Sequence, residues 1–218
     1  MKNLRPRRVA AGLSLALALG LAALPAAQEK GFKALFNGKN LKGFKPVFKD
    51  GADPAATWRV EKGVLVCTGK PNGYLVTEKS YKNYVLRYDW KYARPAGLEG
   101  DDKFNGNSGC LVHITGEHKI WPKSVEVQGA YKDHANIFAI GGAPKGDFKK
   151  DGPAQKAAFR PVGEWNTTEV TSQDGKLTSK LNGVQVCEGR SELKEGPIGF
   201  QSEGAEMHWR NITIKEIK

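Results

Sequence analysis

Side chains suited to acid–base chemistry are concentrated in residues 105–134. Within this stretch Glu126 and Gln128 alternate with Val125 and Val127. Because successive side chains of a β-strand point to opposite faces, this spacing predicts a strand with one apolar face and one face that displays a carboxylate beside an amide. A carboxylate in that position can accept a proton, and the amide can orient it or a substrate. We predict Glu126 as a catalytic residue and Gln128 as a substrate-binding residue, the alternative being that Glu126 forms a structural ion pair.

A second run repeats this combination of residue types. In residues 198–203, strand alternation places Gln201 and Glu203 on the face opposite Phe200. We predict Glu203 as the second catalytic carboxyl group and Gln201 as a substrate-binding residue. The alternative is that Glu203 is an exposed acid in the turn before Gly204.

Strands are the elements that must hold these side chains. Tyr84 to Tyr92 alternates large apolar residues with mostly polar ones, which predicts a long half-buried strand. Asp174-Gly175 and Asn182-Gly183 each separate two strand-like runs, as hairpin turns do. About ten such strands predict an all-β fold of two stacked antiparallel sheets, a jelly-roll sandwich, with a barrel as the alternative. Alternation also predicts which side chains are buried between the sheets (Val125, Val127, Ile198, Phe200) and which share an open face (Glu126, Gln128, Gln201, Glu203).

Two segments are long for connections between strands, namely Ala93–Phe104 and Ile140–Ala158. Long ordered loops in compact domains tend to carry function. We therefore expect both segments to lie at the rim of a cleft.

The first 27 residues predict a secretory signal peptide. Basic residues within positions 2–8 precede an apolar run from Val9 to Leu24, and Pro25-Ala26-Ala27 follows it. The apolar run is too short for a membrane span and ends in small residues. We expect an exported protein, periplasmic or extracellular, whose mature chain has no membrane span.

The mature chain, residues 28–218, has the size of a single domain with a full core. The whole sequence carries a formal charge of +11, but its lysines are scattered and form neither an arginine-rich helix nor an aromatic–basic motif. We predict no nucleic-acid partner and assign the charge to solubility and to attraction toward anionic polymers. Cys67, Cys110 and Cys187 lie in apolar strand-like runs, which favours buried thiols, with one disulfide as the alternative.

Short motifs along almost the whole mature chain carry a family resemblance. They are, in order, Gly31-Phe32 with Leu35 to Phe44, Gly106-Asn107-Ser108-Gly109, Glu126-Val127-Gln128, Gly163-Glu164-Trp165-Asn166, Leu181-Asn182-Gly183, Gly199-Phe200-Gln201 and Arg210-Asn211-Ile212. Together they resemble the 3-keto-disaccharide hydrolase domain family. The resemblance implies a concanavalin A-like lectin/glucanase jelly roll, and a saccharide substrate that is a glycoside oxidised at carbon 3 of the sugar.

A ketone at carbon 3 acidifies the proton on carbon 2, so a base can remove that proton and the glycosidic oxygen on carbon 1 can leave by elimination. This path needs a base, an acid for the leaving oxygen, and a group that stabilises the enediolate. Glu126 is the predicted base, and Glu203 is the predicted acid. The alternative mechanism is direct displacement by two carboxylates, as in ordinary glycosidases.

The resemblance and the residue types suggest further binding residues. We predict that Asn107, His113 and His134 bind the sugar and that Trp121 stacks on its ring. Imidazole and carboxylate suit zinc and similar ions, so one interpretation is that His113 and His134, with His118, hold a divalent metal together with Glu126 and polarise the keto oxygen. The alternative is that these histidines only hydrogen-bond sugar hydroxyls or lie at the surface.

The chain departs from the family pattern at two places. Many members carry an acidic residue shortly after the Glu-x-Gln motif, where this chain has Gly129-Ala130, and many have His-Gly where this chain has Glu203-Gly204. The site is then expected to be rebuilt around Glu203, His113 and His134. Two functions from other classes stay open: a non-catalytic carbohydrate-binding module of the cell envelope, and a structural envelope protein that holds anionic polymer.

Overall fold

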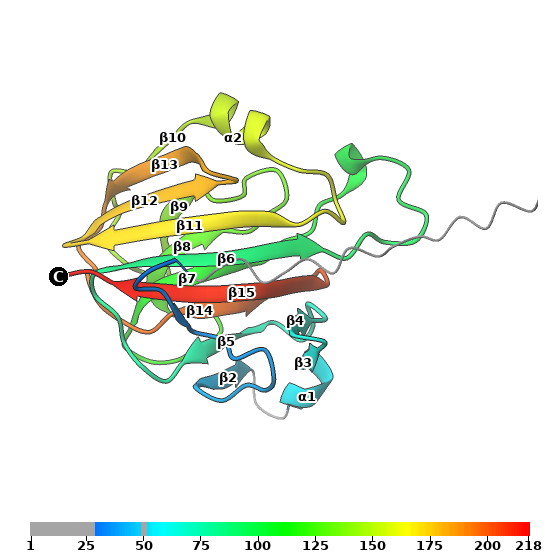
Figure 1. Cartoon of the computed structure of the whole chain (residues 1–218), viewed down its shortest axis with the longest axis horizontal. Coiled ribbons are helices and arrows are strands. Elements are labelled where there is room, and N and C mark those ends of the chain that lie inside the picture. Colours follow the sequence, from blue (N-terminus) through cyan, green and yellow to red (C-terminus); the bar gives the residue numbers. More distant parts are fainter. Residues whose placement is uncertain (1–28, 49–51) are drawn as a thin grey trace, which may run out of the picture.

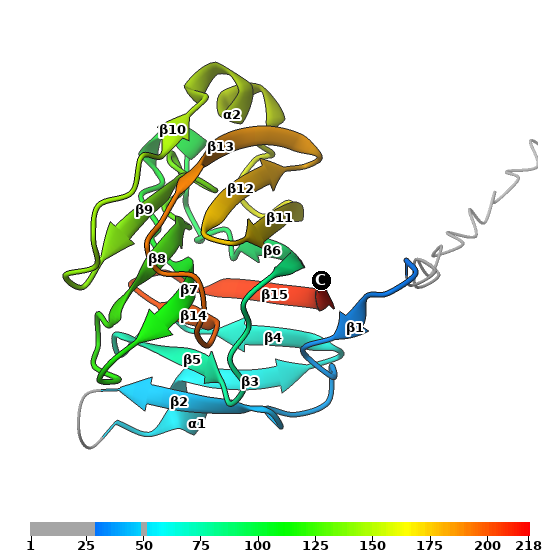
Figure 2. The same ribbon diagram turned by 90° about the vertical axis from the view of Figure 1, so that its left-hand side faces the viewer.

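A computed structural model describes residues 29–48 and 52–218, so the predicted signal peptide lies outside the described residues. Antiparallel strands form two sheets that pack face to face, as Figures 1 and 2 show. The nine-stranded sheet has the order β10 (Lys149–Lys150), β13 (Val184–Arg190), β12 (Lys176–Leu181), β11 (Asn166–Gln173), β6 (Tyr84–Tyr92), β15 (Met207–Glu216), β4 (Val64–Cys67) and β3 (Trp58–Glu61), with β1 (Lys33–Ala34) paired to β15.

The second sheet carries the predicted catalytic side chains. Its order is β2 (Phe44–Phe48), β5 (Gly73–Thr77), β14 (Gly199–Ser202), β7 (Gly109–Thr115), β8 (Lys123–Gln128) and β9 (Ile137–Ile140). Strands that are distant in sequence lie side by side, because β14 is inserted between β5 and β7. This topology confirms the predicted all-β, two-sheet jelly roll.

Hairpins join the strands of the nine-stranded sheet where the sequence predicts them. Asp174 and Gly175 have φ angles of 49° and 84°, and Asn182 and Gly183 have φ angles of 49° and 87°. Two consecutive left-handed residues are what a tight hairpin of matching twist requires, and Asp-Gly and Asn-Gly meet that requirement at low cost.

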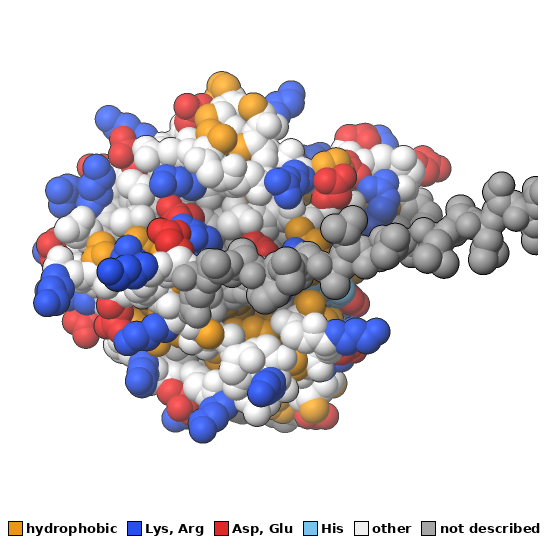
Figure 3. All heavy atoms as spheres, viewed as in Figure 1, with side chains coloured by type: hydrophobic (Ala, Val, Ile, Leu, Met, Phe, Trp, Pro, Cys, Tyr) orange, Lys and Arg blue, Asp and Glu red, His pale blue; other side chains and the backbone are white. Residues whose placement is uncertain are grey.

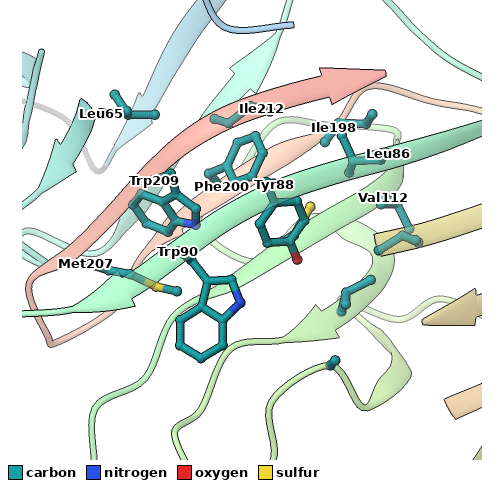
Figure 4. Packing of buried hydrophobic residues seen from close by; sticks show 14 of the residues in the cluster. Leu65, Leu86, Tyr88, Trp90, Val112, Ile198, Phe200, Met207, Trp209 and Ile212 are labelled. Atoms are coloured by element: carbon teal, nitrogen blue, oxygen red, sulfur yellow. The ribbon is translucent and has the colours of Figure 1, made fainter. Parts of the chain in front are cut away.

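The core lies between the two sheets. The inner face of β6 buries every second residue along the strand, as predicted, namely Tyr84, Leu86, Tyr88, Trp90 and Tyr92. Phe200 of β14 packs edge-on against Tyr88 and against Trp209, with ring centroids 5.5 Å and 5.8 Å apart (Figure 4). Val125, Val127 and Ile198 belong to the same cluster, as expected. These contacts pack the inner face of the six-stranded sheet against the nine-stranded sheet, so the outer face of the six-stranded sheet does not take part in this core.

The segment Ile140–Ala158 contains regular structure and does not line the cleft described below. The segment contains β10 and a helix, α2 (Gly152–Ala158), which packs against β13 at the edge of the nine-stranded sheet. Asp151 caps the helix by accepting a hydrogen bond from the Ala154 amide at 2.9 Å, and a proline lies in the first turn. An acidic cap followed by proline is a local signal that period counting over longer windows misses. Two short elements, α1 (Pro54–Thr57) and η1 (Asp101–Lys103), complete the structure.

The surface is charged and mixed. On the face shown in Figure 3, Lys and Arg side chains are interspersed with Asp and Glu rather than gathered in one patch. Cys67, Cys110 and Cys187 are buried free thiols. Within residues 29–48 and 52–218, every helix is too short or too polar to cross a membrane.

Candidate active site

The outer face of the six-stranded sheet brings Glu126 and Gln201 together. Glu126 pairs in register with Leu111, and Gln201 pairs with Tyr74. Leu111 and Tyr74 belong to a second apolar cluster, separate from the main core. Cross-strand partners share a face of the sheet. Both polar side chains therefore lie on the outer face, as predicted.

Gly109 permits the close approach of these two side chains. A Cβ atom at this position would lie 2.2 Å from Gln201 Oε1 and 2.9 Å from Glu126 Oε1. Both oxygens therefore lie over the same glycine, in space that any other residue would fill. Gln201 Oε1 is buried and has no hydrogen-bond donor within the described protein. The Asn-Ser-Gly motif thus shapes the floor of the site.

Burial sets the protonation of Glu126. The residue is 5 % exposed, and burial is the main cause that raises the pKa of its carboxyl group to about 8. The nearby Glu203 carboxylate raises the pKa further, and a hydrogen bond with Gln201 opposes the shift. At pH 7 roughly one Glu126 in ten is ionised. When it is ionised, it is a stronger base than an exposed carboxylate.

Glu203 follows the end of β14 and bridges to Asn107, which precedes β7. Burial raises the pKa of Glu203, and a hydrogen bond with Asn107 opposes this. Two carboxyl groups that repel one another do not ionise together easily, so the pair retains a proton at a pH at which exposed carboxyl groups have lost theirs. Two carboxyl groups and two amides therefore form one cluster, which consists of Glu126, Glu203, Gln201 and Asn107. We call Glu126 and Glu203 the carboxyl pair.

A cleft of about 610 Å³ opens beside Glu203 and Asn107. One wall comes from residues 93–107, which include the segment Ala93–Phe104 that the sequence places at a cleft rim, and the other comes from residues 203–206. The prediction for this segment is confirmed.

Asp101 braces the wall of the cleft. Its carboxylate accepts hydrogen bonds from Arg94 at 2.6 Å, from the Tyr131 hydroxyl at 2.9 Å and from the Val162 amide at 2.9 Å. Burial opposes ionisation, but the bonds from Val162, Arg94 and Tyr131 outweigh it and lower the pKa of Asp101. Sequence analysis missed this brace, because its members lie far apart in the chain and no local pattern marks them.

Gln128 lies beside the site, whereas Trp121 lies away from it. The Gln128 side-chain oxygen accepts hydrogen bonds from the Gly129 and Ala130 amides, both at 2.7 Å, so only its NH₂ group is left for a substrate. Trp121 is half-buried in the loop between β7 and β8. That loop lies at the end of β7 opposite to Asn107, so Trp121 is outside the carboxyl cluster.

His113 is not in the site. It has a positive φ angle of 55° within a β-bulge and points between the sheets. Its Nδ1 lies 2.9 Å from the Leu193 carbonyl oxygen and its Nε2 lies 3.0 Å from Ser172 Oγ, so both ring nitrogens have partners. Burial lowers the pKa of His113 to about 4. The predicted role of His113 in substrate or metal binding is wrong, because the ring is a satisfied core group.

His134 is also in the interior. Its ring stacks on Trp90 with centroids 3.4 Å apart, its Nδ1 lies 2.9 Å from the Gly129 carbonyl oxygen, and burial lowers its pKa to about 3. His113 instead packs on Tyr84. Tyr84 precedes Trp90 by six residues in β6, which is a distance of about 20 Å along the strand. The two histidines therefore cannot share an ion, and the described residues contain no group of three His, Cys, Asp or Glu placed to bind one. The predicted metal site is wrong.

Comparison with known proteins agrees with this geometry. The profile of one family, described as the 3-keto-alpha-glucoside-1,2-lyase-like domain, matches residues 31–215. The chain belongs to this family. The 3-keto-alpha-glucoside-1,2-lyase-like domain thus includes β1 to most of β15, and the resemblance predicted from the motifs is confirmed.

Several proteins that are similar to this chain bear the names of carbohydrate-active enzymes. The 3-keto-disaccharide hydrolase of Bacteroides thetaiotaomicron is 21% identical over an alignment that covers 86% of this chain and 79% of the relative. A solved structure from Parabacteroides distasonis, named as a candidate glycosyl hydrolase, is 26% identical with a TM-score of 0.60 and covers 86% and 95% of the two chains. The β-glucanase of Bacillus licheniformis, 10% identical with a TM-score of 0.53 over 86% and 97%, shares the concanavalin A-like fold.

Proposed function

We propose that this protein cleaves glycosides oxidised at carbon 3 by removing the carbon-2 proton and eliminating the glycosidic oxygen. Family membership supports action on a glycoside. The observation that carries the mechanism is the buried Glu126 carboxyl group, held over Gly109 beside Gln201, with its pKa raised to about 8 by burial and by the nearby Glu203.

Glu126 is the base in this proposal. It takes the carbon-2 proton, the electrons of that C–H bond form the double bond between carbons 1 and 2, and the bond from carbon 1 to the glycosidic oxygen breaks. A base with a pKa near the working pH combines adequate ionisation with strong proton affinity. Water can then add to the product glycal, which gives net hydrolysis.

Glu203 is the acid that protonates the leaving oxygen. Glu203 lines the cleft, where a leaving group has room, whereas Glu126 on the outer face of the sheet is more deeply buried. Asn107, Gln201 and the NH₂ group of Gln128 are the amides available to bind sugar hydroxyls and the enediolate.

The direct test is incubation of the protein with a 3-keto-glucoside and with its unoxidised parent in deuterated water. We expect cleavage of the oxidised glycoside only, with deuterium entering carbon 2, because the proton is not acidic enough without the ketone. Equal cleavage of both glycosides without deuterium at carbon 2 would instead indicate displacement by two carboxylates. Binding without any turnover would indicate a carbohydrate-binding module.

We also propose that residues 1–27 direct export and are removed. The charged start, short apolar run and small residues support this. Intact-mass measurement of protein from the periplasm or medium tests it, and a chain that keeps Met1 and stays in the cytoplasm would contradict it.

A further inference from the structure

The side chains of Glu126 and Gln201 converge on one point above Gly109. The position that a Cβ atom of residue 109 would occupy is 2.2 Å from Gln201 Oε1 and 2.9 Å from Glu126 Oε1. Glu126 is 5 % exposed and Gln201 is 1 % exposed. Two hydrogen-bond acceptors therefore lie close together in an enclosed space, which is favourable only if one of them carries a proton.

The side-chain oxygen of Gln201 lacks a donor. Among the described residues, none donates a hydrogen bond to this buried atom. An unsatisfied buried acceptor costs free energy, so it needs an explanation. The backbone of Gln201 is held by β-pairing with Tyr74 and by a 2.9 Å hydrogen bond from Ser108 Oγ to the Gln201 carbonyl oxygen. The side chain thus starts from a fixed position, and its oxygen has to find a donor nearby.

The surroundings of Glu126 narrow the choice of donor. Leu111 on β7 and Phe138 on β9 lie opposite Glu126 in register, and neither side chain can donate. Glu203 acts on Glu126 through its charge and raises the pKa of Glu126. Cys110 is affected by the charge of Glu126, but its thiol is buried in the core between the sheets. The proton of Glu126 itself remains as the donor for the amide oxygen.

A protonated carboxyl group and an amide match each other through two hydrogen bonds. The carboxyl O–H donates to the amide oxygen, and an amide N–H donates to the other carboxyl oxygen. The hydrogen bond with Gln201 that opposes the rise in the Glu126 pKa is the second of these, because a donor favours the ionised carboxylate. Ionised Glu126 keeps that bond alone, and the amide oxygen is then without a donor, which is the arrangement observed.

We propose that Gln201 is a positioning residue that holds Glu126 in both protonation states, through its NH₂ group when Glu126 is ionised and also through its oxygen when Glu126 is protonated. The inference rests on the proposed function for its consequence in catalysis, but the pairing needs no substrate. When Glu126 takes the carbon-2 proton, its new O–H group donates to Gln201, so a hydrogen bond forms as the C–H bond breaks. Gln201 thus favours proton transfer without contacting the reacting atoms, and the second hydrogen of its NH₂ group remains for the sugar.

Infrared spectroscopy of the resting protein tests the pairing. Subtraction of the Glu126→Gln spectrum isolates the C=O stretching band of protonated Glu126 at pH 6, which is below the Glu126 pKa of about 8. We expect the band at the low wavenumber of a carboxyl group whose O–H donates a hydrogen bond. A band at the higher wavenumber of a carboxyl group without such a bond would overturn the proposal, and this measurement requires no substitution at Gln201.

Substitutions at Gln201 locate the partner of the proton. Gln201→Met keeps the length of the side chain and removes both hydrogen-bonding groups, so the band should move to higher wavenumber. Gln201→Glu keeps an oxygen in the same place, so the band should stay low. Gln173→Met makes the first change at an exposed position of β11 and should leave the band where it is. A band that stays low in Gln201→Met, with an unchanged melting temperature, would contradict the assignment.

Kinetics connects the pairing to the reaction. In Gln201→Met, kcat for a 3-keto-glucoside should fall by about tenfold, the effect of one lost hydrogen bond, with a smaller change in KM. Gln173→Met should leave both values unchanged. A rise in KM alone would show that Gln201 binds the sugar and does not assist Glu126, which would overturn its role in proton transfer.

The two kinds of measurement separate this proposal from the proposed function. If the infrared band shows the pairing and no 3-keto-glycoside is turned over, the pairing stands and the elimination mechanism falls. If 3-keto-glycosides are turned over with deuterium entering carbon 2, but the band is that of a carboxyl group without a hydrogen bond from its O–H, the pairing falls and the mechanism stands.

Discussion

Glu126 and Glu169 lie on the outward faces of the two sheets, each near the middle of its strand, and they differ in burial and in the charge of their neighbours. Glu169 on β11 contacts Arg87 at 2.6 Å and Lys180 at 3.0 Å, and these cations outweigh burial and lower its pKa. Glu126 has an amide and a second carboxyl group for neighbours, and its pKa rises to about 8. The same residue type is thus an ion-pair partner on one face and the proposed base on the other, and deeper burial together with the absence of a neighbouring cation accounts for the difference in pKa.

Removal of the two carboxylates should separate these roles most strongly. Glu126→Gln keeps the shape and loses the proton acceptor, so turnover of a 3-keto-glucoside should fall by roughly 10²–10⁴-fold with little change in folding. Glu169→Gln is the matched control and should leave kcat and KM within about twofold of the wild type. Steady-state kinetics with both variants checks this, and a Glu126→Gln variant with normal turnover would end the assignment of the base.

A substitution at Gly109, which lies under Glu126 and Gln201, tests whether the close approach of these two side chains matters. In Gly109→Ala the new Cβ would displace the Gln201 and Glu126 side chains, so activity should fall by about 10–100-fold, since small displacements of reacting groups are costly. Gly152→Ala in α2 is the control, because the nearest atom to its Cβ would be 3.9 Å away and the backbone is helical. Equal activity of the two variants would show that the approach over Gly109 is not required.

The pH dependence of the reaction distinguishes the base from the acid. A 4-nitrophenyl leaving group needs no acid, so its kcat/KM should follow ionisation of Glu126. We expect it to rise about tenfold per pH unit below pH 8 and then level off. A poorer leaving group such as methyl also needs the protonated acid, so its kcat/KM should fall relative to that of the 4-nitrophenyl compound as Glu203 ionises. If Glu126 were the acid, the 4-nitrophenyl profile would pass through pH 8 without a rise.

Stability should also depend on pH in opposite ways at the two glutamates. Between the ordinary pKa of 4.5 and about 8, folded Glu126 binds more protons than unfolded Glu126, so the free energy of unfolding falls as pH rises. Glu126→Gln should remove that fall, and its stability relative to the wild type should increase by about 2–4 kcal/mol between pH 5 and pH 9. Urea unfolding at several pH values measures this, and parallel curves for the two proteins would contradict the shifted pKa.

The ion pairs of Glu169 should give the smallest effect. Its pKa is lowered, so its stabilisation is present above the unfolded pKa and is lost as pH falls. Both cations are partly exposed, so Glu169→Gln should cost at most about 1 kcal/mol at pH 7, less at high salt and almost nothing in acid. A larger loss that persists in high salt would place Glu169 among the strongly buried pairs.

Local periodicity explains which of these features the sequence predicts. Glu126 and Gln201 are correctly placed because β8 and β14 keep an unbroken period of two. His113 is misplaced because the bulge adds a residue to β7, so that Val112 and His113 both point inward and Ile114 points outward again. A bulge of one residue reverses the face of the sheet toward which the following side chains point, and no residue pattern in the sequence indicates where the bulge lies.

Features that depend on contacts between distant segments are likewise absent from the sequence pattern. His134 lies in a loop without periodicity, and its stacking on Trp90 follows from the way β6 passes beneath it. The Asp101 brace joins three segments that are separated by tens of residues. The cleft itself is a product of two such segments, so its lining is known only once the chain is folded.

The position of β14 and β15 in the sheets bears on when the protein acquires its activity. Both strands come from the last part of the chain, residues 199–216, yet each occupies an interior position, β14 between β5 and β7 and β15 between β6 and β4. During synthesis neither sheet can close until the ribosome has released this final segment, and pairing across such sequence distances is slow. Glu203 and Gln201 arrive on that same segment, so an incomplete chain has half a carboxyl pair and no reactive centre. The proposed carboxyl pair is therefore complete only when β14 has joined the six-stranded sheet.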